Sequence, residues 1–263
     1  MNLNWSVITA LVLLSLPGAL TTPAHADTEV DVALVLAVNI SISMDPEEQE
    51  LQRQGFVEAF RSPQVHHAIS GGMLGRISVT YMEWAGSTVQ NFVVPWTEIG
   101  GPEEALSFAS RLAQAPIRRG PRTSISGAID ASMRLLATSK VEAVRRVIDI
   151  SGDGPNTHGR SVTQAREEAL AQGVTINGLP LLLKRTTSSW DVENLDEYYR
   201  DCVIGGPGAF MIPVRERQQF ADAIKTKIIR EIAVLAPDAA VVPIQVQPER
   251  RTNCEAMITP WGN

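Results

Sequence analysis

The sequence predicts an α/β fold with a doubly wound, mostly parallel central sheet, helices on both faces and one antiparallel edge strand. A continuous β-branched and aliphatic run at residues 30–38 is typical of a strand buried on both faces. Strand and helix patterns then alternate along the chain, which indicates parallel strands joined by helices. The short connection "AGST" at residues 85–88 allows its two flanking strands to form the antiparallel hairpin.

The first strand leads into a helix that we expect to run from Pro46 to about Phe60. Asp45 is a favourable N-cap, proline suits the first helical position, and Glu48 completes a capping box. The later elements are expected in this order: strands 76–85 and 87–96, helices 102–113 and 125–138, strand 145–151, helix 162–172 ended by Gly173, strand 174–183, a short helix within 195–203, strand 209–214 and a long helix at 215–235.

The chain divides into a leader, a domain and a tail. Residues 7–20 are mostly apolar and are followed by the small-x-small sequence "AHA", so residues 1–26 are interpreted as a signal peptide and the protein as secreted or periplasmic. An uncleaved membrane anchor is the alternative, although Ser15, Pro17 and Gly18 interrupt the apolar run. Residues 27–236 form the expected domain, and residues 237–263 form a Pro-rich tail.

Charge and cysteine content limit the possible functions. The net charge of −6 argues against non-specific binding to nucleic acid or anionic lipid, which requires a clustered basic surface. In an exported protein, the pair Cys202 and Cys254 suggests one disulfide that tethers the tail, with two unpaired thiols as the alternative. A zinc site is poorly supported because no histidine is suitably spaced with these cysteines.

Oxygen-bearing side chains follow the strands at the edge where ligands of such folds bind. The loop "LAVNISISMD" contains Asn39, Ser41 and Ser43 directly after the first strand. The segments "RTSISG" and "ISGDGPNTHG" add further oxygen donors, namely Thr123, Ser124, Ser126, Ser151, Asp153, Asn156 and Thr157. Such donors suit Mg²⁺, Mn²⁺ or Ca²⁺.

With "VLAVNISIS", "RTSISGAID" and "VIDISGDG" in this order, residues 30–235 resemble the von Willebrand factor type A (vWA) family, in particular a secreted bacterial subfamily of unknown function. The resemblance implies a Rossmann-type fold and a metal-ion-dependent adhesion site. Ser41, Ser43 and Thr123 match its direct ligands, and Asp153 matches the carboxylate that usually holds a metal-bound water. Asn39 replaces the expected aspartate, so we expect Mg²⁺ (or Mn²⁺ or Ca²⁺) to bind weakly or only with a partner carboxylate.

Each of these residues also has a simpler interpretation: the serines and Thr123 as helix caps, and Asp153 as a turn residue. Three arginines precede Thr123 and are candidates for guiding an acidic protein partner, with a solvated basic loop as the alternative: Arg118, Arg119 and Arg122. The expected function is a non-enzymatic module that binds a protein partner. The alternatives are a structural scaffold with a metal-free site and a hydrolase that uses His158.

Overall fold

The computed structural model describes residues 28–183, 194–233 and 252–255. Its sheet has the strand order β3-β2-β1-β4-β5. The strands are β1 (Thr28–Asn39), β2 (Ile77–Trp84), β3 (Gln90–Ile99), β4 (Val141–Gly152) and β5 (Val174–Pro180). β1 pairs in parallel with β2 and β4, and β5 pairs in parallel with β4. β3 pairs antiparallel with β2 at the edge, so the predicted sheet is confirmed.

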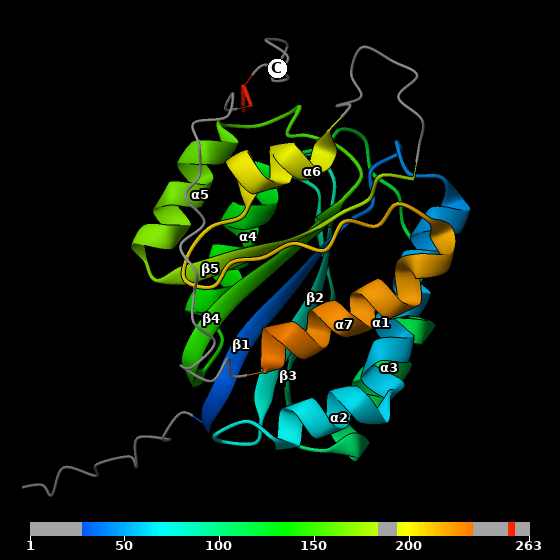
Figure 1. The fold of residues 1–263 in the computed structure, drawn as a ribbon, viewed down its shortest axis with the longest axis vertical. Coiled ribbons are helices and arrows are strands. Elements are labelled where there is room, and N and C mark those ends of the chain that lie inside the picture. Colours follow the sequence, from blue (N-terminus) through cyan, green and yellow to red (C-terminus); the bar gives the residue numbers. More distant parts are fainter. Residues whose placement is uncertain (1–27, 184–193, 234–251, 256–263) are drawn as a thin grey trace, which may run out of the picture.

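Helices cover both faces of this sheet (Figure 1). The first apolar core lies under α1 (Pro46–Arg61), α2 (Pro63–Ser70), α3 (Pro102–Gln114) and α7 (Phe220–Ile232). The second core lies under α4 (Ile125–Ala137), α5 (Val162–Ala171) and the short α6 (Leu195–Tyr198). The capping box of Asp45 and Glu48 is present at the start of α1. This cap fixes where the loop after β1 ends and the helix begins.

Two predictions about individual elements were wrong, and one helix was missed. Residues 209–214 make only isolated bridges beside β5, because the Asn177 side chain accepts the Phe210 N–H and Pro213 has no N–H to donate. The long helix begins at Phe220 and not at residue 215, after a 3₁₀ turn at Arg217–Gln219. The helix α2 was missed, although Ser62 and Pro63 supply a capping side chain and a first helical proline.

A buried ionic cluster joins α7 to the centre of the sheet. Lys227 Nζ lies 2.9 Å from Asp149 Oδ1 on β4 and 2.5 Å from Glu231 Oε1 on α7, and all three side chains are at most 1% exposed. Asn177 on β5 donates to the second oxygen of Glu231 over 2.6 Å. Buried charges need such partners, so the cluster fixes the position of α7 on the sheet.

The tail is attached to the domain by the disulfide between Cys202 and Cys254. Glu255 next to it accepts hydrogen bonds from Ser161 and Thr163 at the start of α5. The predicted signal peptide and most of the predicted tail lie outside the described residues. Within the residues that are described, no helix is long and apolar enough to cross a membrane.

Candidate functional site

The first site loop leaves the end of β1 with its backbone held on both sides. The Ile40 N–H donates to Trp84 O at the end of β2, and the Ile40 carbonyl accepts from Gly120 N. The Ile42 N–H donates back to Gly120 O over 2.9 Å. The loop is therefore paired with the segment that carries the basic residues, and its side chains are fixed relative to that segment.

Asn39 is fully buried at the start of this loop, and its amide has one possible orientation. The Ser41 N–H lies 2.8 Å from one amide atom, which must be oxygen because a backbone N–H can only donate. The other amide atom is then Nδ2, which lies 2.9 Å from Asp153 Oδ1. Asn39 therefore donates a hydrogen bond to the carboxylate of the third loop.

The two serines of the loop face the same carboxylate. Ser43 Oγ donates to Asp153 Oδ1 over 3.0 Å, and Ser41 Oγ lies 3.5 Å from that oxygen. The two hydroxyl oxygens are 2.6 Å apart, which is within hydrogen-bonding distance. The structure thus brings together Asn39, Ser41, Ser43 and Asp153 from two separate strand ends.

Thr123 lies in the second loop, next to the third loop. Thr123 is 8% exposed, and its carbonyl accepts hydrogen bonds from Thr157 N and His158 N, each over 3.0 Å. Within the described part of the chain, the hydrogen bonds at Thr123 are made by this carbonyl and not by the hydroxyl. The backbone contacts therefore place Thr123 beside the third loop, without joining its side chain to the hydrogen bonds around Asp153.

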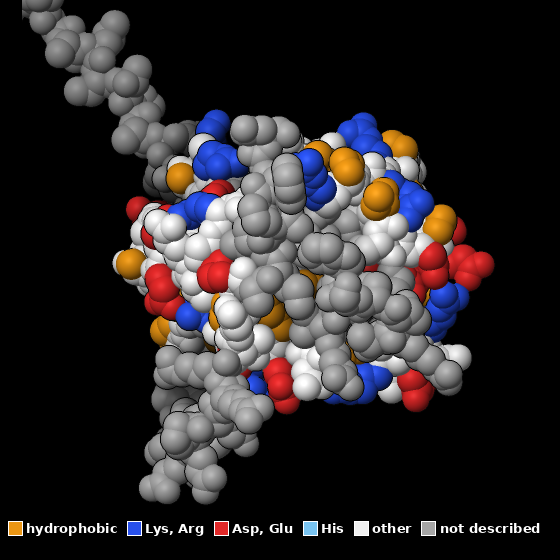
Figure 2. Space-filling model, turned by 90° about the horizontal axis from the view of Figure 1, so that it is seen from above, with side chains coloured by type: hydrophobic (Ala, Val, Ile, Leu, Met, Phe, Trp, Pro, Cys, Tyr) orange, Lys and Arg blue, Asp and Glu red, His pale blue; other side chains and the backbone are white. Residues whose placement is uncertain are grey.

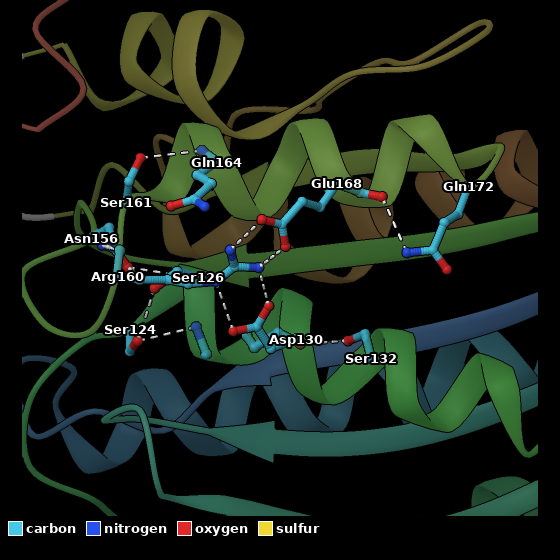
Figure 3. A network of polar contacts seen from close by, with 12 residues as sticks. Ser124, Ser126, Asp130, Ser132, Asn156, Arg160, Ser161, Gln164, Glu168 and Gln172 are labelled. Carbon is cyan, nitrogen blue, oxygen red and sulfur yellow. Dashed lines mark hydrogen bonds and ion pairs between the residues drawn. The ribbon is translucent and has the colours of Figure 1, made fainter.

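The other oxygen-bearing residues of these loops have structural partners. Ser124 caps α4 by accepting from Gly127 N, and Ser151 accepts from Gln52 of α1. Asn156 is fully buried, and its Oδ1 accepts from Ser126 N over 3.0 Å (Figure 3). Their side chains make hydrogen bonds inside the fold, so we assign these four positions to structural roles: Ser124, Ser126, Ser151 and Asn156.

An ion-pair network secures the end of the third loop (Figure 3). Arg160 lies between α4 and α5, with Nη2 at 2.7 Å from Asp130 Oδ1 and 2.6 Å from Glu168 Oε2. These hydrogen bonds raise the pKa of Arg160 and lower that of Glu168. The residues are partly exposed, so we assign this network to positioning of the loop and attribute little stability to it.

The three arginines of the basic loop are exposed and differ in their contacts. Arg119 donates to the carbonyls of Ile42 and Met44, over 2.9 and 2.5 Å, and so holds the first site loop. Arg118 donates to Asn91 Oδ1 over 3.2 Å. Arg122 lies 2.6 Å from His158 Nε2. Among the described residues, none of the three arginines makes an ion pair with a carboxylate, although Arg118 interacts electrostatically with the buried Glu83.

Apolar side chains are exposed beside these arginines. Ile42 is 61% exposed between the two site serines, and Ile117 is 44% exposed next to Arg118. Figure 2, which views the molecule from above, shows hydrophobic side chains exposed among basic and acidic ones. We call Ile42, Ile117, Arg118 and Arg122 the basic edge.

Two supports of the site were missed in the sequence. The turn between β2 and β3 contacts the second loop, where Ser124 N donates to Ala85 O and Gly86 N donates to Pro121 O. Buried polar residues of α1 lie beneath the first loop, where Gln49 donates to the Ser41 carbonyl over 3.4 Å. The i, i+3 spacing of Gln49 and Gln52 on a buried helix face was the available signal.

His158 does not form a catalytic pair with a serine among its described contacts. Its Nδ1 accepts from Ser87 N over 3.1 Å, and its Nε2 faces the Arg122 guanidinium. Burial lowers the pKa of His158, and the Arg122 charge lowers it further. A hydrolytic base must reach the hydroxyl that it activates, and these two contacts direct the ring elsewhere.

The donor set fits a metal-free site better than a Mg²⁺ site. Asp153 is the only carboxylate among the matched positions, and its Oδ1 accepts hydrogen bonds from Asn39 and Ser43. A hard divalent cation would have to displace these bonds and would face the donating Nδ2 of Asn39. Among the described residues, no group of three or more His, Cys, Asp or Glu side chains could hold a metal ion.

Comparison with known families identifies the chain. Residues 29–236 match the family described as "protein of unknown function (DUF1194)", and the chain belongs to this family. No curated protein matches it. The fold is that of vWA domains, as the similar solved structures show.

Three solved structures illustrate this similarity. Proximal thread matrix protein 1 from the mussel byssus, "with zinc occupied MIDAS motif", has a TM-score of 0.57 and 12% identity, over 77% of this chain and 48% of that one. The pilus adhesin SpaC from Lactobacillus rhamnosus GG has a TM-score of 0.55 and 13% identity, over 77% and 30%. The vWF domain of the type V pili tip protein Mfa5 from Porphyromonas gingivalis has a TM-score of 0.51 and 10% identity, over 77% and 95%. This chain therefore spans about half of the mussel protein and less than a third of the adhesin.

Proposed function

We propose that this DUF1194 protein is an exported, non-enzymatic binding module that recognises an acidic protein partner through a degenerate adhesion site. The signal peptide is residues 1–26, the binding domain is residues 27–236, and residues 237–263 form the tail. The disulfide between Cys202 and Cys254 supports export, because such bonds persist in oxidising compartments. The observation that carries the proposal is the hydrogen bond from Asn39 to Asp153.

In this proposal the Asn39 amide joins the first and third loops, which is the role of the cation in a complete adhesion site. With aspartate at position 39, two carboxylates would meet at the strand ends and a cation would be needed between them. The Nδ2 group of Asn39 instead donates to Asp153 Oδ1 over 2.9 Å, which joins the first and third loops without metal. Ser41 and Ser43 lie around this contact, and Thr123 lies beside the third loop through its backbone carbonyl. Mg²⁺ then binds weakly, or only when a partner supplies another carboxylate, and recognition of the partner itself needs no metal.

The partner is proposed to be acidic because the basic edge carries exposed positive charge. Arg118 and Arg122 are exposed and make no ion pair with a carboxylate among the described residues, although the whole chain has a net charge of −6. Ile42 and Ile117 offer apolar contact beside them. An acidic side chain flanked by apolar residues would complement both features.

The similar structures support binding over catalysis. The mussel protein is a thread matrix protein, and SpaC and Mfa5 are a pilus adhesin and a pili tip protein. The contacts of His158 with Arg122 and with the Ser87 N–H also argue against a hydrolytic serine–histidine pair. We therefore assign no catalytic residue.

The proposal is tested by affinity capture with the immobilised exported chain, in EDTA and in Mg²⁺. The test variant carries Arg118→Gln and Arg122→Gln and keeps Arg119, because Arg119 holds the first site loop. Arg134→Gln on α4 is the matched control, since Arg134 is exposed and outside the basic edge. We expect a partner that is retained in EDTA by the natural chain and by the control, and lost by the double variant at low salt.

Two outcomes contradict the proposal. Retention that is unaffected by the double variant would mean that the partner binds elsewhere, as in a scaffold domain. Retention that always requires Mg²⁺ would mean that a metal-loaded site carries the binding.

A further inference from the structure

Arg122 and His158 lie side by side at the basic edge, where the hydrogen-bond donors around the His158 ring outnumber its acceptors. Arg122 Nη1 is 2.6 Å from His158 Nε2, and Ser87 N is 3.1 Å from His158 Nδ1. The guanidinium and the backbone N–H can only donate, whereas a neutral imidazole has a single acceptor nitrogen. In one of the two contacts, two N–H donors therefore face each other without an acceptor. If the ring were protonated, both contacts would be of this kind.

The Ser87 contact decides which nitrogen carries the hydrogen. The backbone of Ser87 is fixed by the turn between β2 and β3, and its N–H points at Nδ1. The ring hydrogen then lies on Nε2 and faces the guanidinium. The exposed arginine and the partly buried histidine thus present two donors to each other, and an oxygen anion that accepts from both would fill this fork and relieve the contact.

The backbone at Arg122 is a second, independent indication of function. Its φ is +67°, in the left-handed region that favours glycine. Gly86 N donates to Pro121 O beside it, so the loop geometry is imposed by the neighbouring turn. A glycine would adopt this conformation without strain, and strained backbone positions cluster at functional sites.

We propose that Arg122 and His158 form a metal-independent receptor for a carboxylate, which the guanidinium and the Nε2–H bind through its oxygens. This inference deepens the proposed function and rests on it, since the carboxylate would belong to the acidic partner. The chemistry is shared by an Asp or Glu side chain and by a chain terminus. Arg118 lies in the same loop and adds positive charge without sharing the fork.

The test uses acetate as the probe and the full exported chain with its disulfide formed. Acetate is titrated at constant ionic strength while the ring nitrogens and the Arg122 side-chain signals are followed by NMR. We expect saturable shifts at His158 Nε2 and Arg122 in the natural chain and in Arg134→Gln. Arg122→Gln should weaken the apparent affinity at least about tenfold, as expected for loss of a charge-assisted pair. Arg122→Gly should do the same while relaxing the backbone.

Several results would overturn the receptor. Equal responses to acetate and to chloride, a response to inorganic phosphate only, or an unchanged affinity in Arg122→Gln would each do so. Carboxyl-bearing peptides with a free or an amidated C-terminus then distinguish a chain terminus from an acidic side chain. Acetate binding without any captured partner would sustain the receptor and reject the proposed function. A captured partner without acetate binding would sustain the proposed function and reject the receptor.

Discussion

Replacing Asn39 with aspartate should make the domain dependent on a divalent cation. In the natural chain Nδ2 donates to Asp153 Oδ1 over 2.9 Å. In the variant, two carboxylate oxygens would face each other at that separation. Two unit charges about 3 Å apart repel by roughly 5–6 kcal/mol at an effective dielectric constant near 20. Side-chain relaxation should leave a measured loss of about 3 kcal/mol in the free energy of unfolding.

The assay is urea unfolding of both chains in EDTA and in Mg²⁺, with calorimetry of Mg²⁺ binding. We expect the Asn39→Asp variant to lose stability in EDTA and to recover about 2.7 kcal/mol when free Mg²⁺ is about a hundredfold above its dissociation constant. The natural chain should change little, because its loops are already joined by the amide.

Asn177→Asp is the matched control for this variant. Asn177 is also buried and also donates to a carboxylate, over 2.6 Å to Glu231 Oε2, but its hydrogen bonds within the described residues involve no hydroxyl group. This control should lose stability in EDTA and gain nothing from Mg²⁺. Our account of Asn39 would be refuted if Asn39→Asp were as stable as the natural chain in EDTA, or if Mg²⁺ rescued both variants equally.

Three further predictions concern stability. Arg122→Gly should raise the free energy of unfolding, measured with urea, by about 1 kcal/mol, because glycine adopts the positive φ of this position without strain. A loss of stability would contradict the claim that the Arg122 backbone is strained. Reduction of the disulfide between Cys202 and Cys254, which are 52 residues apart, should cost about 4 kcal/mol in the chain-entropy model, measured by unfolding with and without reductant. Burial raises the pKa of Asp149 to about 6, so the folded state holds this proton more tightly than the unfolded state does. The free energy of unfolding should fall by up to about 3 kcal/mol as pH rises from about 4 to 6, and Asp149→Asn should flatten this slope.

The sheet was predictable because its signals are local. The apolar run of β1 and the capping box at Asp45 each specify an element without reference to the rest of the chain. The strand prediction for residues 209–214 was wrong because a contact between distant segments decides their structure. Their composition suits a strand, but the Asn177 side chain takes the Phe210 N–H, which is a contact between distant segments.

The candidate site shows the same division. The order of the three loops along the sequence places Asn39, Ser41, Ser43 and Asp153 at one edge, and the structure brings these four together. The direction of the Asn39 amide could not be read from the sequence, because it depends on the Ser41 N–H and on Asp153 together. The pairing of Arg122 with His158 likewise arises only when the second and third loops meet.

The Asn39 side-chain amide signal in NMR tests the central claim most directly. Our account places one Nδ2 hydrogen in a hydrogen bond to Asp153. It predicts a shifted, slowly exchanging amide hydrogen in EDTA that stays in place on addition of micromolar Mg²⁺. A solvent-exchanging amide in EDTA, or a signal that moves and saturates at micromolar Mg²⁺, would show that a cation and not the amide joins the loops.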